Sequence, residues 1–157
     1  MNREKTIAIL RYYRDADKMI RLNDRVIKNL EDQYYSSVGA VNMDGMPKGK
    51  GGVSSPTEQT ALNVPRSVTR TIRDMEHENE KLEKIKAEIL QELNRLTFHQ
   101  RTVILGFYID GLQWERISAQ TNYSPRQCRN IRDRALERLA KRFSANKAVS
   151  RFKFPEN

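Results

Sequence analysis

The sequence is poor in the residues from which metal sites and covalent cross-links are built. Its 157 residues include one cysteine, Cys128, and two histidines, His77 and His99. A single cysteine excludes an intrachain disulfide and a zinc site made of several thiolates. The two histidines lie on different predicted helices at no spacing suited to a metal ion, and the chain shows no nucleophile–base set. We therefore expect no metal, no cofactor and no catalytic residues, and the chain is not predicted to be an enzyme.

Long apolar runs are absent as well. No run approaches the ~18–20 residues that a helix needs to cross a bilayer. The first ten residues, MNREKTIAIL, lack the apolar core of a signal peptide. We therefore expect a soluble cytoplasmic protein with no membrane partner.

Basic residues outnumber acidic ones, and their excess is unevenly distributed. The chain has 29 Lys and Arg against 20 Asp and Glu, a formal net charge of +9. From residue 97 to the end, 12 Lys and Arg face 5 Asp and Glu, so this stretch alone carries +7. Such a surplus favours a polyanionic partner, either nucleic acid or an anionic membrane surface. The alternative is a basic surface that contacts only solvent.

Heptad repeats predict two long helices in the first 96 residues. One covers residues 5 to 36 and the other runs from about residue 66 to residue 96, each with two rows of mostly apolar side chains spaced seven apart. An apolar seam is unstable in water, so the two helices are predicted to pair, as an antiparallel hairpin within one chain or between chains in a homodimer. Asn23 and Asn79 interrupt the two seams. Such residues often fix register or partner number, or they mark a weakly packed spot.

Residues 37 to 55 separate these helices and contain five of the seven glycines. This composition predicts a flexible loop, and the stretch lacks the GK[ST] sequence of a phosphate-binding loop. Lys48 and Lys50 are candidate contacts to DNA or RNA polymerase. The sequence Ser-Pro-Thr-Glu from Ser55 predicts the start of a short helix, and Pro65 predicts a break at residues 63 to 65.

Residues 96 to 143 contain three predicted helices with very short connections. Thr97 and Gln100 form a capping box that opens the first helix, and Gly111 is predicted to end it in a left-handed conformation. The second helix begins near Gln113, carries a partly buried Trp114, and is followed by Asn122, which tolerates left-handed geometry. This is the layout of a helix-turn-helix domain that binds duplex DNA.

The last of these helices opens at residues 124 to 127 with a serine cap and a proline, and runs to about Phe143. Its inward face is predicted to be apolar: Cys128, Ile131, Ala135, Leu136 and Leu139. An α-helix fits the major groove and reaches base edges with its first turns. The candidates for base reading are therefore the outward residues Arg126, Gln127, Arg129, Asn130 and Asp133. The candidates for phosphate contact are Arg116, Ser124, Arg132, Arg134, Arg138, Lys141 and Arg142. The alternative is an amphipathic helix with a solvated basic face.

This segment resembles region four of bacterial sigma factors, the module that reads the −35 promoter element. The likeness covers about 48 of the 157 residues. It lies in Val103-Ile104-Leu105, Tyr108 to Gly111, Gln113 to Ser118, Tyr123-Ser124 and Ala135-Leu136 with Leu139. Arg129 and Asn130 match the DNA-facing positions of the family in type, whereas Pro125 and Arg126 differ from its common choices. Ser118, Asn122 and Tyr123 stand where alanine, glycine and a β-branched aliphatic are usual.

The chain as a whole resembles phage and prophage late-gene transcription activators of the ArpU and RinA type. Those proteins combine an N-terminal helical region, a GMP-K-G-like loop, here residues 45 to 49, and a C-terminal region-four-like domain. The helical patterns predict an all-α protein with a helical hairpin in residues 1 to 95, a DNA-binding helix-turn-helix domain in residues 96 to 143 and a flexible basic tail in residues 144 to 157. In the tail, Phe152 and Phe154 are candidates to anchor it on the body of the protein or to engage a partner.

The function that these patterns imply is sequence-specific binding of double-stranded DNA to regulate transcription, with activation of late genes alongside RNA polymerase. One alternative is a small-terminase-like DNA-packaging subunit, which also couples a helix-turn-helix to a helical oligomerisation region. Another is a sigma-like adaptor that binds RNA polymerase and little DNA.

Overall fold

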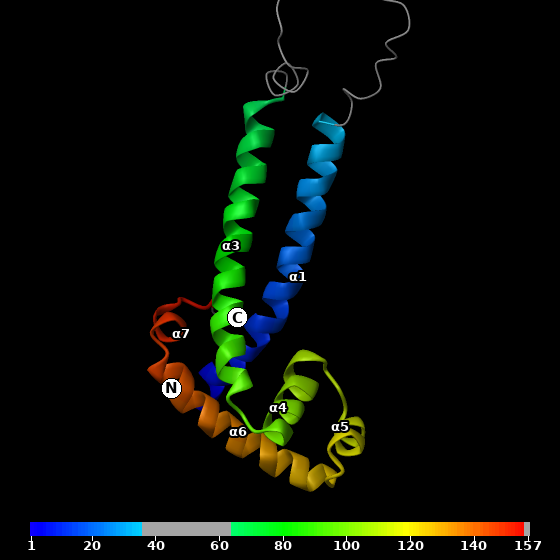
Figure 1. The fold of residues 1–157 in the computed structure, drawn as a ribbon, viewed down its shortest axis with the longest axis vertical. Coiled ribbons are helices and arrows are strands. Elements are labelled where there is room, and N and C mark those ends of the chain that lie inside the picture. Colours follow the sequence, from blue (N-terminus) through cyan, green and yellow to red (C-terminus); the bar gives the residue numbers. More distant parts are fainter. Residues whose placement is uncertain (36–63, 156–157) are drawn as a thin grey trace, which may run out of the picture. The chain divides into compact units, whose positions relative to one another are not determined.

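The computed structural model describes residues 1–35 and 64–155, and every regular element in these two ranges is a helix. The predicted all-α class is therefore confirmed. The elements in chain order are α1 (Arg3–Tyr34), α3 (Arg66–Asn94), α4 (Phe98–Ile104), the π-helical turn η2 (Leu105–Ile109), α5 (Trp114–Thr121), α6 (Pro125–Ala145) and α7 (Lys147–Arg151) (Figure 1). The predicted glycine-rich loop, the two lysines in it and the short helix at Ser55 lie outside the described residues.

The two long helices lie where the heptad repeats predict them. α1 begins at Arg3 and ends at Tyr34, and α3 begins at Arg66, directly after Pro65. The proline marks the start because its ring restricts the preceding residue to extended backbone, while its own carbonyl accepts a hydrogen bond from Val68 N at 3.0 Å. The predicted break at residues 63 to 65 is thus confirmed for the described residues, 64 and 65.

The chain forms two compact units that are joined through α1 and α3. Unit 1 comprises Met1–Met19 and Lys81–Asn157, and unit 2 comprises Ile20–Glu80. This division differs from the predicted one, which assigned all of residues 1 to 95 to a separate hairpin. The first turns of α1 and the last turns of α3 belong instead with the helices that follow.

In unit 2, α1 and α3 pair within one chain (Figure 1). The Asn23 side chain is 4% exposed and donates through Nδ2 to Asn79 Oδ1 at 2.9 Å and to Glu78 Oε2 at 3.1 Å. Asn79 Nδ2 in turn donates to Asp24 Oδ1 at 2.8 Å. The two asparagines that interrupt the seams therefore meet each other. Because a slip of either helix would leave these polar groups without partners, the pair specifies the register of the hairpin.

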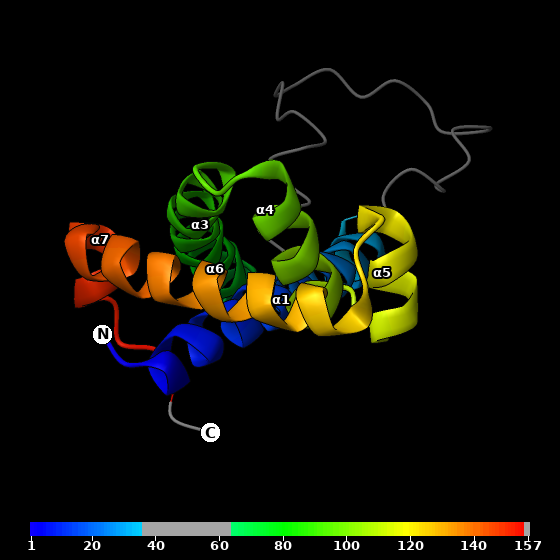
Figure 2. The ribbon, with the colours of Figure 1, turned by 90° about the horizontal axis from the view of Figure 1, so that it is seen from below.

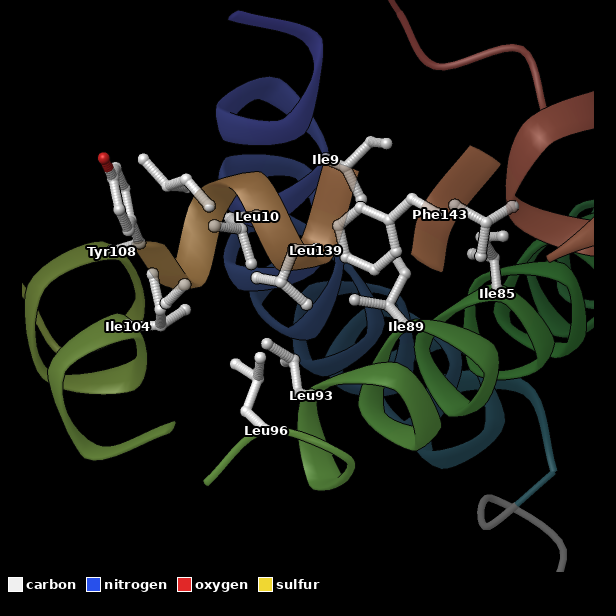
Figure 3. Packing of buried hydrophobic residues seen from close by; sticks show 13 residues of the cluster. Ile9, Leu10, Ile85, Ile89, Leu93, Leu96, Ile104, Tyr108, Leu139 and Phe143 are labelled. Atoms are coloured by element: carbon white, nitrogen blue, oxygen red, sulfur yellow. The ribbon is translucent and has the colours of Figure 1, made fainter. Parts of the chain in front are cut away.

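Unit 1 has one main apolar core, built from α1, α3, α4 and α6. Figure 2 shows α6 lying across the first turns of α1, with α5 at one end of α6 and α7 at the other. Leu139 and Phe143 of α6 are fully buried between side chains of α1 and α3 (Figure 3). The core comprises Ile9, Leu10, Ile85, Ile89, Leu93, Leu96, Ile104, Tyr108, Ala135, Leu136, Leu139, Phe143 and Val149. The predicted DNA-binding segment thus shares its core with both long helices.

The chain after Phe143 differs from the predicted flexible tail. Asn146 caps α7 by accepting hydrogen bonds from Ala148 N and Val149 N at 3.0 and 3.1 Å, and Val149 is fully buried. The Phe152 and Phe154 rings then pack on the Tyr12 ring of α1, with centroids 5.5 and 5.1 Å apart. Phe152 and Phe154 therefore anchor the tail on α1, which is one of the two roles that the sequence left open for them. This segment has too few apolar positions to show a helical period. The sequence alone therefore did not predict that it packs on the rest of unit 1.

Candidate nucleic-acid interface

The turn between α5 and α6 is held by side chains on both of its sides. Asn122 adopts the left-handed conformation with φ 58°, as its residue type predicts. The Ser118 hydroxyl donates to the carbonyl of Tyr123, and Thr121 Oγ1 donates to the carbonyl of Ile117 at 2.8 Å. Thr121 Oγ1 also lies 3.3 Å from the sulfur of buried Cys128. These contacts fix where α6 begins relative to α5.

The helix that precedes this turn is capped and ended by the predicted residues. Thr97 and Gln100 form the capping box, and Gly111 has a φ of +66°, the left-handed value that glycine tolerates best. The sequence did not single out Gly106, which lies where η2 crosses α5. A Cβ atom there would be 3.2 Å from Ile117 Cγ1, so the glycine permits the close approach of the two helices.

The start and the inward face of α6 also match their predictions. Ser124 caps the helix by accepting a hydrogen bond from Gln127 N at 3.2 Å, and Pro125 occupies the first turn. Of the five residues predicted to face inward, four are buried and Ile131 is half-buried. Trp114 is half-buried, as predicted.

Four of the five candidates for base reading lie exposed on the first turns of α6: Arg126, Gln127, Arg129 and Asn130. Two of these are guanidinium groups and two are carboxamides, the side chains that pair bidentately with guanine and adenine respectively. The first turn also carries backbone N–H groups that attract anions. The arrangement presents hydrogen-bonding groups and positive charge on one end of one helix.

Asp133, the fifth candidate, is engaged within the protein. Its Oδ1 accepts from Arg3 Nη2 at 2.6 Å and from Arg132 Nε at 2.8 Å. Partial burial raises the pKa of Asp133, but the hydrogen bonds and charges of Arg132 and Arg3 outweigh this effect and hold the pKa below its ordinary value of 3.8. Through Oδ1, the carboxylate connects α1 to α6.

This ion pair predicts a dependence of stability on pH. Because the pKa of Asp133 is lowered on folding, its contribution is complete above the unfolded value and is lost as the pH falls through the folded value. The side chain is 41% exposed, so the contribution is that of a surface pair, about 0.2–1 kcal/mol. Asp133→Asn should make the loss of stability between pH 5 and pH 3 less steep in urea unfolding curves. Arg3→Ala should make the same loss of stability less steep in part. An unchanged pH dependence of stability in both variants would contradict the assignment of this ion pair.

Two aromatic rings lie beside the base-reading candidates. The Trp114 ring stacks on the Phe107 ring, with centroids 4.5 Å apart and planes 19° apart. The Arg129 guanidinium lies over the Trp114 ring at 5.5 Å, and the Arg132 guanidinium lies 5.3 Å from the Trp114 ring and 5.9 Å from the Phe107 ring. These distances fall within the range of cation–π attraction. The sequence predicted Trp114 as a core residue and did not connect it with the arginines.

The candidates for phosphate contact divide into two groups. Arg116, Arg134, Arg138 and Lys141 are exposed, whereas Arg132 and Arg142 are half-buried and paired with carboxylates. Ser124 is exposed, and its hydroxyl oxygen already serves as the helix cap. The exposed group therefore retains its charge for a polyanion, while Arg132 and Arg142 have structural partners.

Arg142 pairs with the buried carboxylate of Glu92, which is 6% exposed. Glu92 Oε2 lies 3.5 Å from Arg142 Nη1 and 3.5 Å from Arg95 Nη1, and Oε1 accepts from Asn146 Nδ2 at 3.1 Å. These contacts connect α3 to the end of α6 and to the cap of α7. Arg142 is thus a partner of a buried carboxylate, whereas the sequence predicted it to contact phosphate.

Arg142→Ala is expected to lower the free energy of unfolding by about 1–2 kcal/mol, because Glu92 would keep its buried charge with only Arg95 and Asn146 as partners. The measurement is urea unfolding followed by tryptophan fluorescence. Lys141→Ala, the neighbouring exposed cation, is the matched control and should change stability by less than about 0.5 kcal/mol. Equal stability of the two variants would contradict the structural role of Arg142, which would then count with the exposed candidates for phosphate contact.

His77 and His99 are exposed, and no three His, Cys, Asp or Glu side chains in the described ranges are placed to hold a metal ion. None of the helices in these ranges combines the length and apolarity that a bilayer crossing requires. No protein-family model, curated protein or solved structure matches this chain.

Proposed function

We propose that this chain is a sequence-specific DNA-binding protein that regulates transcription, and that α6 enters the major groove of its target. One observation carries the proposal. Arg126, Gln127, Arg129 and Asn130 are exposed together on the first turns of a helix whose start is fixed by α5 and the turn before it. In helix-turn-helix proteins, base contacts come from this part of the second helix.

The charge of the same helix supports the proposal. Arg134, Arg138 and Lys141 follow on α6 and are exposed, and Arg116 is exposed on α5. Cations that flank a reading surface contact phosphates, which hold the helix in register without reading sequence. α6 can therefore supply both kinds of contact that specific recognition needs.

The likeness to sigma region four and to phage late-gene activators supports a narrower form of the proposal. In this form the protein activates late genes of a phage or prophage, with RNA polymerase as a second partner. The support for this narrower form comes from the residues that carry the likeness, in particular the stretch from Gln113 to Ser118 and the turn that follows it.

Sequencing of duplexes selected from a random pool at near-physiological salt tests the proposal. We expect one discrete enriched motif, and its symmetry would report whether one or two copies bind. Arg70→Ala, which removes an exposed arginine of unit 2, is the control and should return the same motif. Tight, salt-sensitive binding with no enriched motif would contradict specific recognition. In that case, rings of eight or more subunits would favour a packaging role. Absence of duplex binding together with binding to RNA polymerase would instead favour an adaptor.

A further inference from the structure

We propose that Trp114 is the positioning residue of the DNA-reading surface, and that its ring holds Arg129 ready to bind a base while Arg132 stays part of the fold. The inference deepens the proposed function and rests on it. It assigns different roles to two arginines that both lie over the Trp114 ring. The argument depends on what else each guanidinium contacts.

Arg132 is held by more than the rings. Its Nε donates to Asp133 Oδ1 at 2.8 Å, and its side chain is 20% exposed. It also lies within 6 Å of both aromatic rings, at 5.3 and 5.9 Å. Release of Arg132 toward DNA would break the ion pair and both cation–ring contacts, so this arginine is expected to stay in place.

Arg129 has a different environment. It is exposed, and its guanidinium contact within the described residues is the face of the Trp114 ring at 5.5 Å. A contact with a ring face uses no hydrogen-bond acceptor, so the guanidinium keeps its N–H donors for another partner. An ion pair would have occupied one or two of those donors. The ring thus restrains the side chain without consuming the groups that read a base.

This restraint favours binding because arginine loses much rotamer freedom when it is fixed on a base. A side chain that is already confined in the free protein loses less, and the difference adds to affinity for the site that it fits. Random DNA, which engages arginines through phosphates, gains little from the same confinement. Trp114 is therefore expected to affect the preference among sequences more than the overall strength of binding.

The ring can position Arg129 because it is itself fixed. Trp114 is the first residue of α5, stacks on Phe107 of η2, and packs against a small buried cluster of Val103, Ile117 and Cys128. That cluster joins α4, α5 and α6. The position of the ring, and with it the position of the Arg129 guanidinium, is therefore set by all three helices.

Substitution of Trp114 separates the aromatic face from simple filling of space. Trp114→Leu keeps an apolar side chain without a π face, whereas Trp114→Tyr keeps the face. We expect Trp114→Leu to weaken binding to the preferred duplex by about two- to five-fold, the value of an exposed cation–π contact, with little change for a random duplex. Trp114→Tyr should retain most of the preference. If Leu and Tyr behave alike, the ring acts only by packing and the inference is wrong.

A double-mutant cycle tests whether Trp114 acts through Arg129. In an Arg129→Ala background, Trp114→Leu should have no additional effect on the preferred duplex. Additive losses would show that the ring acts independently of this arginine and would overturn the inference. Thermal unfolding of each variant shows which comparisons involve folded protein.

The wild-type chain offers a readout that does not depend on any variant folding. Trp114 is its only tryptophan, so intrinsic fluorescence reports on this ring alone. Addition of the preferred duplex should change the emission because the base that Arg129 binds comes to lie beside the Trp114 ring, and random duplex should change it much less. An unchanged emission on addition of a tightly bound preferred duplex would contradict the inference while the proposed function stands. If no duplex is preferred over the others, both the inference and the proposed function are contradicted.

Discussion

Leu10→Ala is expected to lower the free energy of unfolding by about 2–5 kcal/mol, the usual range for removal of a fully buried leucine. Leu10 has no exposed surface and belongs to the core that α1 shares with α3, α4 and α6. The substitution would leave a cavity between helices that already pack closely, because the neighbouring side chains are themselves buried (Figure 3). Urea unfolding followed by the fluorescence of Trp114 reports on unit 1, to which both residues belong.

Leu90→Ala is the matched control for this experiment, because Leu90 also lies in unit 1. It makes the same change in α3, but Leu90 is 38% exposed, so the expected change in stability is within about 0.5 kcal/mol. A small effect in both variants would mean that residues 96 to 155 fold without the first turns of α1. A large effect in Leu10→Ala alone would mean that the folding of α6 depends on a segment more than 100 residues earlier in the chain, since Leu10 and Pro125 are that far apart.

The features that the sequence predicted well are those with local causes. Thr97, Pro65 and Asn122 each act within a few residues, through a side-chain cap, a restricted backbone or a tolerated left-handed turn. The positions of the helices therefore follow from short patterns. The two apolar seams predicted that the long helices pair either within one chain or between two chains. The contact between Asn23 and Asn79 shows that α1 and α3 pair within one chain.

The features that the sequence did not predict depend on residues far apart in the chain. Arg3 and Asp133 form an ion pair across 130 positions, and no periodicity within either segment indicates it. A weak signal existed for the shared core, because Leu10 is a second apolar residue beside Ile9 and outside both seams. Such a residue needs a partner other than the opposite helix of the hairpin.

A helical-wheel projection of α6 would have separated the half-buried candidates for phosphate contact from the exposed ones. Arg132 and Arg142 lie 4 and 14 residues after Cys128, spacings that return to the buried face of an α-helix. Both are half-buried and paired with a carboxylate. Charge type had suggested DNA contacts for these residues, whereas their angular position on the helix indicates partners within the protein.

Arg129→Ala is expected to weaken binding to the preferred duplex by about 1–3 kcal/mol, or roughly 5- to 150-fold, and to relax the preference at one base pair. The reason is that a guanidinium that donates two hydrogen bonds to a guanine edge discriminates that base from the other three. Of the candidates on α6, Arg129 is exposed and already oriented by the Trp114 ring. The measurement is a set of equilibrium titrations with the selected duplex, its single-base variants and a random duplex at several salt concentrations.

Arg138→Ala provides the comparison, because Arg138 is exposed on the same helix nine residues later, beyond the first turns that carry the base-reading candidates. Its loss should weaken binding to all duplexes by a similar factor and reduce the slope of log affinity against log salt by about 1, as expected for one phosphate contact. Arg129→Ala should differ in kind, with a larger loss on the preferred duplex than on the random one. If both variants weaken every duplex equally, Arg129 contacts phosphate only. The reading of sequence would then fall to Arg126, Gln127 and Asn130, the other exposed polar side chains on the first turns of α6.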